Sequence, residues 1–263
     1  MTVFVRLGYS YNEEQKAALM HYGVKGMKWG VRKDRRGSGG GPGAAKPKVS
    51  QYEFTPETLS QRDAIFEKAV LCNFSSARER GAKRLSDLPK IIGSNDIDDK
   101  LRAANPLYKT DTDAYTKNCT LAAIAYEARS RRFDVEAIAY TEDLDSDGPP
   151  ASNVLNLFLT SRIFESPPPI MQVDAGGAVE AITEQFRQWG EGSRGIVHME
   201  HEDGLAHAFN VEVSGGKVRF VDAQDGSHNM SKFLSEAVGA VKFMRTDNAD
   251  FSEHILDVVK PRR

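Results

Sequence analysis

The sequence of residues 207–226, HAFNVEVSGGKVRFVDAQDG, decides the fold. Its centre, Gly215-Gly216, is typical of the two-residue turn of a β-hairpin, so we expect an antiparallel strand on each side. The pairing that such a turn imposes sets Glu212 opposite Arg219, and opposite charges at facing positions stabilise a sheet. The register therefore predicts Glu212 and Arg219 as an exposed pair on the outer face.

The other face of this hairpin is apolar and is expected to turn inward. Side chains alternate across a strand, so this face carries, at the open end of the hairpin, His207, Asp222 and Gln224. Asp222 lies diagonally from His207, within reach of a hydrogen bond between imidazole and carboxylate. A buried carboxylate is costly unless it is paired, so two interpretations fit: a structural pair that closes the hairpin, or part of a catalytic site.

A cysteine stands where an apolar helix is expected to begin. Asn118 is a favourable N-cap residue, and Cys119 opens an expected helix over residues 119–132. Free N–H groups and the helix dipole at this end favour an anion, so the thiol can become a nucleophilic thiolate. The alternative is a small buried hydrophobic residue, which is also the interpretation of Cys72 on its apolar helical stripe.

The order of these groups along the chain predicts the fold class. A cysteine at a helix start, followed by a histidine and an acid on a later hairpin, is the layout of papain-type enzymes. Further strands are expected at 195–199, 208–213, 217–222 and 240–245, after the helices. Helices followed by antiparallel strands indicate an α+β fold.

Residues from about 105 to 226 resemble the papain-fold toxin family of the glutamine-deamidase type. The matching pieces are Asn105-Pro106, Asn118-Cys119-Thr120, RRFDVEA at 131–137, AHAFNV at 206–211 and VDAQDG at 221–226. The resemblance implies a papain-like α+β fold in which Cys119 is the nucleophile, His207 the base and Asp222 the orienting acid. It also implies that Gln224 lines the site and that no cofactor is needed.

The expected reaction is cysteine-dependent hydrolysis of an amide in a protein substrate, from the host or from a virion. The resemblance favours deamidation of a glutamine side chain, and a papain-like cysteine protease would use the same groups. The backbone N–H of Cys119 is expected to hold the oxyanion, and Asn118 and Gln224 are the further candidates for substrate or oxyanion contacts.

The first 45 residues are expected to form a basic, flexible arm that ends in the Gly-rich linker 37–45. Residues 1–49 carry ten lysines and arginines against three acidic residues, while the whole chain has a net charge of −2. The stretch HYGVKGMKWGVRK, residues 21–33, resembles a peptide found in structural proteins of tailed bacteriophages.

That second resemblance implies a phage or prophage source and a docking peptide for capsid proteins. Its anchors would be Tyr22, Met27, Lys28 and Trp29, and the arm is also a candidate for weak nucleic-acid contact. A non-enzymatic component of the phage head is therefore the alternative to an enzyme.

Composition narrows the remaining possibilities for this chain of 263 residues. Two cysteines do not make a disulfide scaffold, and no apolar run is long enough for a membrane span or a signal peptide. His198 and His201 lack the spacing of a zinc helix and are expected in a solvated loop, so no metal site is expected. We expect three regions, namely the arm at 1–45, a helical segment at 46–104 and a papain-like domain at 105–263. We expect the protein in the virion or in the cytoplasm of a bacterial host.

Overall fold

A computed structural model describes residues 47–53, 76–109, 113–139, 157, 160–201 and 206–262. Within this part of the chain, the fold is α+β, with a helix that begins at Cys119 packed on an antiparallel sheet, as expected for a papain-like fold. None of the helices in these ranges is long and apolar enough to cross a membrane.

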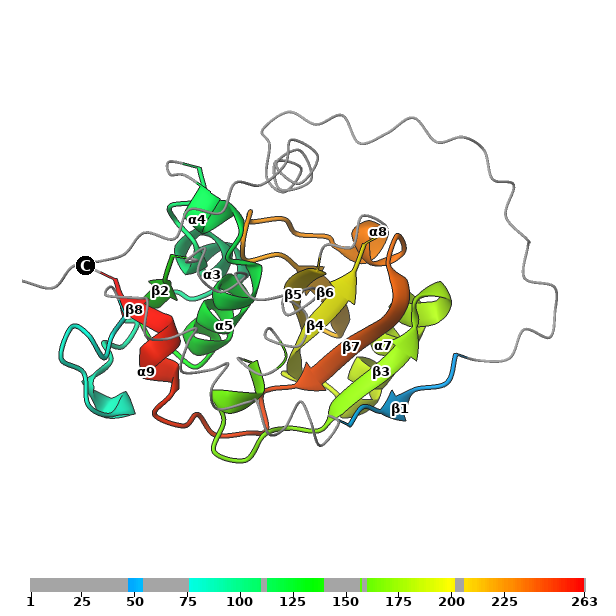
Figure 1. Ribbon diagram of the computed structural model, residues 1–263, viewed down its shortest axis with the longest axis horizontal. Helices are drawn as coiled ribbons and strands as arrows, with labels where there is room; N and C mark the ends of the chain where they lie inside the picture. Colours follow the sequence, from blue (N-terminus) through cyan, green and yellow to red (C-terminus); the bar gives the residue numbers. More distant parts are fainter. Residues whose placement is uncertain are drawn as a thin grey trace, which may run out of the picture. The chain divides into compact units, whose positions relative to one another are not determined.

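The main sheet has six strands, all paired antiparallel, and Figure 1 shows them in the order β1-β3-β7-β4-β5-β6. A separate pair joins β2 to β8. The strands are β1 Ser50–Gln51, β2 Val135–Ala137, β3 Ile170–Asp174, β4 Arg194–Glu200, β5 Ala206–Ser214, β6 Lys217–Val221, β7 Val238–Arg245 and β8 Val259–Pro261. The four strands expected from the sequence correspond to β4, β5, β6 and β7.

The helices of the described residues are short, apart from two that flank the sheet. They are α3 Ile97–Ala104, α4 Asp113–Thr116, α5 Cys119–Ser130, α7 Ala178–Trp189, α8 Ser231–Leu234 and α9 Ile255–Val258, with 3-10 turns at Leu85–Asp87 and Ala175–Gly177. The helix expected over 119–132 is α5. It ends two residues early because Arg132 adopts a left-handed φ of 68°.

Both faces of the sheet are covered, and this is the reason why both sets of alternating side chains are buried. One core cluster joins α5 to the sheet residues Ile196, Ala208, Val221 and Met244. The other joins α7 to Val197, Phe209, Val211, Phe220 and Phe243. In a sheet covered on both faces, polar side chains at alternate strand positions are buried, and they must find hydrogen-bonding partners there.

The hairpin register predicted from the glycine pair is confirmed, since Glu212 is paired with Arg219. Gly215 and Gly216 have φ values of 60° and 70°, the left-handed conformation that a tight hairpin turn needs. The carboxylate of Glu191 accepts hydrogen bonds from both backbone N–H groups of this turn, at 2.8 and 2.9 Å. These bonds fix the closed end of the hairpin.

The predicted exposure of Glu212 is wrong. Its side chain is only 5% exposed and lies beneath α3 and α5. The Nζ of Lys100 donates to Oε2 of Glu212 at 2.6 Å, and the hydroxyl of Tyr126 donates to the same oxygen at 2.8 Å. Strand alternation identified the face correctly, but it carries no information on the helices that cover that face.

Residues 77–92, which belong to the segment 46–104 expected to be helical, form no α-helix. The structure places only the 3-10 turn Leu85–Asp87 there, and the carboxylate of Asp87 accepts the backbone N–H groups of Lys83 and Arg84 instead of a helical pattern. Ala77 and Leu88 pack in the same core cluster as α5. The expected helix around Cys72 lies outside the described residues, and the boundary at residue 104 stays a prediction.

Candidate active site

Cys119 is the first residue of α5 and lies against the beginning of β5. The residue is 8% exposed and its thiol is free. The backbone N–H of Ala208, one residue after His207, donates a hydrogen bond to the sulfur. The structure thus brings the predicted nucleophile to the end of the strand that carries the predicted base.

His207 and Asp222 meet as the hairpin register predicts. The Nε2 of His207 lies 2.7 Å from Oδ2 of Asp222, and both side chains are buried. The remaining carboxylate oxygen, Oδ1, accepts the backbone N–H of Gln224 at 2.8 Å. The turn after β6 is closed by a hydrogen bond from the N–H of Asp222 to the carbonyl of Ser227 at 2.8 Å. Hydrogen bonds therefore fix both the carboxylate and the backbone of Asp222.

The electrostatics favour a charged pair of Cys119 and His207. Burial by itself raises the pKa of the Cys119 thiol, but a hydrogen bond from His207, the charge of that imidazole and the N–H of Ala208 outweigh it, and the thiol pKa is lowered. Burial lowers the pKa of His207, yet the Asp222 carboxylate and the Cys119 sulfur raise it well above its ordinary value. Because Asp222 engages Nε2, Nδ1 is the ring nitrogen left to exchange a proton with the thiol.

The imidazole of His207 is also held by aromatic rings. The ring of Phe233, on α8, meets His207 edge-on with a centroid distance of 5.3 Å. The ring of His201 stacks on Phe233, also at 5.3 Å. These aromatic contacts were not predicted, because the local sequence of α8 does not show that Phe233 packs against His207 at the start of β5.

Asn118 precedes the nucleophile but does not cap α5. Its side chain makes no capping hydrogen bond; instead, Nδ2 donates to Oδ1 of Asn105 and to the carbonyl of Ile138, both at 3.1 Å. Both amide hydrogens are therefore used inside the protein. The first-turn N–H groups of α5 remain as candidates to hold an oxyanion.

Gln224 lies beside the acid, as expected from the sequence. Its Nε2 donates to the backbone carbonyl of Thr116 at 2.9 Å, and its own backbone carbonyl accepts from Nδ2 of Asn105 at 3.0 Å. Tyr108 is a further neighbour, missed from the sequence: burial, and then the charges of Asp225 and Asp222, raise the pKa of its hydroxyl.

The expectation of a solvated loop is wrong for His198, whereas His201 follows the end of β4 and its side chain is 22% exposed. His198 is 1% exposed within β4, and its Nε2 lies 3.2 Å from Oγ1 of Thr160. Burial, followed by the charges of Lys242 and His207, lowers the pKa of His198 to about 3, so its ring is neutral. Among the described residues, no group of three His, Cys, Asp or Glu side chains is placed to bind a metal. The docking residues Tyr22, Met27, Lys28 and Trp29 lie outside the described part of the chain.

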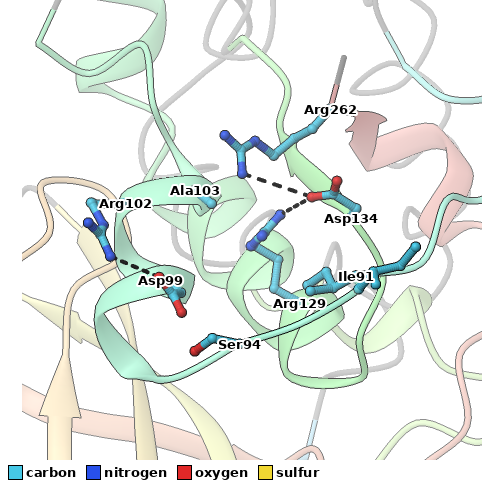
Figure 2. Close-up of a pocket in the computed structure, with 9 residues that line it drawn as sticks. Ile91, Ser94, Asp99, Arg102, Ala103, Arg129, Asp134 and Arg262 are labelled. Atoms are coloured by element: carbon cyan, nitrogen blue, oxygen red, sulfur yellow. Dashed lines mark hydrogen bonds and ion pairs between the residues drawn. The ribbon is translucent and has the colours of Figure 1, made fainter.

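A cavity of about 420 Å³ lies at the opposite end of α5 (Figure 2). Arg129, which lines it, is ten residues after Cys119, or about 15 Å along the helix axis. Figure 2 shows its three arginines facing carboxylates: Arg102 contacts Asp99 at 2.8 Å, while Arg129 and Arg262 share Asp134 at 2.8 and 3.9 Å. This cavity is lined by a salt-bridge cluster and contains no residue of the site around Cys119.

Comparison with known proteins agrees with this geometry. No curated protein and no solved structure matches the chain. Residues 12–36 match a family described only as a family of unknown function. Residues 117–227, the region that holds Cys119, His207 and Asp222, match the family described as papain fold toxin 1, glutamine deamidase.

Proposed function

We propose that this protein is a cysteine-dependent amidohydrolase that deamidates a glutamine side chain of another protein. The observation that carries the proposal is the buried arrangement of Cys119, His207 and Asp222, with a lowered thiol pKa and a raised imidazole pKa. This arrangement falls inside the region that matches the deamidase family.

The first half of the reaction uses the thiolate of Cys119. The sulfur attacks the carbon of the glutamine carboxamide, and the first-turn N–H groups of α5 stabilise the negative oxygen of the tetrahedral intermediate. The imidazolium of His207 then donates its proton to the leaving nitrogen. Ammonia departs, and the acyl group stays bound to Cys119 as a thioester.

The second half regenerates the thiolate. His207, now neutral, accepts a proton from water, and the oxygen of that water attacks the thioester carbon. The products are the glutamate side chain and free Cys119. Asp222 keeps the ring of His207 in one orientation throughout and stabilises its charged form.

The burial of the site supports a side-chain amide over a peptide bond. Cys119, His207 and Asp222 are 8%, 5% and 3% exposed. A glutamine side chain is slender and reaches inward from a surface, whereas a protease must seat several residues of an extended backbone along a cleft. A papain-like protease uses the same three groups and is the second candidate.

Ammonia release from carbobenzoxy-Gln-Gly, together with the intact mass of casein, tests the reaction type. We expect the parent protein to release ammonia and to convert glutamines of casein to glutamates without cutting the chain. Cys119→Ser, which keeps the volume but removes the thiolate, should do neither, while Cys72→Ser should retain activity. New peptide termini without ammonia would make the protein a protease, and no product from the parent protein would contradict an enzymatic role.

The source, the location and the role of the first 45 residues are further parts of this proposal. The resemblance of residues 21–33 to a phage structural peptide supports a phage or prophage origin and a location in the virion or host cytoplasm. In this proposal the arm docks the protein to capsid proteins, with weak nucleic-acid contact through its basic residues. The proposed substrate is a protein of the host or the virion.

Deletion of residues 1–45 tests the role of the arm. The truncated protein should keep the thiol reactivity of Cys119 and lose co-sedimentation with capsids. Retained co-sedimentation would contradict the docking role. Wild-type levels of particle assembly with Cys119→Ser, together with absent ammonia release from the parent, would instead favour a non-enzymatic head component.

A further inference from the structure

Asn105 joins the elements that carry the nucleophile and the acid. It directly follows α3 and is buried, with 5% of the residue exposed. Its Oδ1 accepts from Nδ2 of Asn118 at 3.1 Å, and its own Nδ2 lies 3.0 Å from Oδ1 of Asn118. The two carboxamides therefore form a reciprocal pair directly before Cys119.

The same amide reaches the loop of the acid. Nδ2 of Asn105 lies 3.0 Å from the carbonyl of Gln224 and 3.0 Å from the carbonyl of Tyr115, so its two hydrogens are shared among three acceptors. The backbone N–H of Gln224 in turn donates to Oδ1 of Asp222 at 2.8 Å. Asn105 is thus hydrogen-bonded to Asn118, which precedes the nucleophile, and to Gln224, which is itself hydrogen-bonded to the acid.

These contacts close a ring around the site. On one side of the ring, Asp222 is hydrogen-bonded to His207, and the imidazole of His207 interacts electrostatically with the thiol of Cys119. The other side runs through amides only. In order, the complete ring is Cys119, His207, Asp222, Gln224, Asn105, Asn118 and, through the peptide bond, Cys119 again.

We propose that Asn105 is a positioning residue that fixes the start of α5 against the Asp222 loop and so sets the contact between Cys119 and His207. Four buried hydrogen bonds to one carboxamide are hard to replace, because each acceptor left without a donor away from water destabilises the arrangement. The proposal rests on the proposed role of Cys119 as the nucleophile.

The consequence for reactivity follows from the balance at the thiol. Burial raises the pKa of Cys119 and only the contact with His207 and the N–H of Ala208 reverses this. If α5 is free to move relative to the Asp222 loop, burial remains while the contact weakens. The thiol then holds its proton to higher pH.

The test is the pH dependence of alkylation of Cys119 by iodoacetamide, in a Cys72→Ser background. We expect Asn105→Ala to raise the apparent thiol pKa by roughly one unit and to slow alkylation below that pKa about tenfold. Asn105→Ser, which keeps one donor, should shift the profile in the same direction but less. An Asn105→Ala profile that superimposes on the parent profile would overturn the proposal, and if that variant does not fold, an unshifted Asn105→Ser profile would do so.

Asn95 supplies a matched control at the other end of the same helix. Its Nδ2 donates to the carbonyl of Arg129 at 2.6 Å, so Asn95→Ala also removes an amide bond that holds α5. We expect Asn95→Ala to lower the melting temperature without shifting the alkylation profile. An equal shift in both variants would show a general loss of stability and would refute the positioning role.

Alkylation keeps this test separate from the proposed function. It measures the thiol itself and needs no glutamine substrate. A shifted profile in Asn105→Ala combined with no ammonia release from the parent would contradict deamidation and still support the positioning role. Ammonia release by the parent with an unshifted Asn105→Ala profile would do the opposite.

Discussion

Replacing Lys100 by Met should strongly destabilise the protein, because it leaves the carboxylate of Glu212 buried without its cation. The two side chains are 9% and 5% exposed, and the Nζ–Oε2 distance is 2.6 Å. At an effective dielectric constant of about 20, unit charges at this separation attract by roughly 6 kcal/mol. Part of this is offset by the desolvation of both groups, so we expect a loss of about 3–5 kcal/mol in the free energy of unfolding.

The control variants separate charge burial from other effects. Arg219 is the cross-strand neighbour of Glu212 but is exposed, so Arg219→Met should cost no more than about 1 kcal/mol. Adding Glu212→Gln to Lys100→Met removes the unpaired charge and keeps an acceptor for the hydroxyl of Tyr126. The double variant should therefore recover most of the lost stability.

Urea unfolding at neutral pH measures these four proteins directly. A loss of less than about 1 kcal/mol for Lys100→Met, equal to that of Arg219→Met, would refute the reasoning. It would mean that Glu212 faces solvent, as strand alternation alone suggests, and that α3 and α5 do not cover this face of the sheet.

Three further results are expected. Asp222→Asn should lower the pKa of His207 by removing a charge, leave the proton on the thiol, and reduce ammonia release by roughly 100-fold or more; parent-like activity with an unchanged pH profile would contradict this. The pKa of His198 is about 3 in the folded protein and 6.5 in the unfolded one, so the stability that the neutral ring contributes is complete above pH 6.5 and is lost as the pH falls. Between pH 7 and 5, the free energy of unfolding of the parent, measured with urea, should fall by about 2 kcal/mol more than that of His198→Leu. Equal losses would refute the buried neutral ring. Gly195→Ala should cost about 1–3 kcal/mol, since a Cβ there would clash with the carbonyl oxygen of Met244; an unchanged melting temperature would contradict that packing.

The hairpin and its active groups were predictable because they depend on local chemistry. A glycine pair fixes the register of two strands, and the register alone places His207 beside Asp222. The helix start at Cys119 was predictable for the same reason, since an apolar helical run begins there. These features need no knowledge of what packs around them.

What could not be predicted depends on contacts between distant segments. Glu212 and His198 were expected to face solvent, but both are buried. Tyr126 on α5 supplies a polar partner for Glu212, and Thr160 supplies one for His198. Asn118 has the chemistry of an N-cap, yet Asn105 offers its side chain a closed pair of hydrogen bonds instead. A buried polar side chain needs hydrogen-bonding partners, but the local sequence does not show which distant residues provide them.

The central claim is that Cys119 attacks a glutamine carboxamide, and trapping of the acyl-enzyme tests it most directly. The protein is mixed with carbobenzoxy-Gln-Gly, quenched in acid within the first turnover, and mapped by peptide mass spectrometry. The account predicts an adduct on the peptide that contains Cys119, equal in mass to the substrate less ammonia, and no adduct on Cys72 or in Cys119→Ser. Release of ammonia without any adduct on Cys119, or with Cys119→Ser as active as the parent protein, would contradict it.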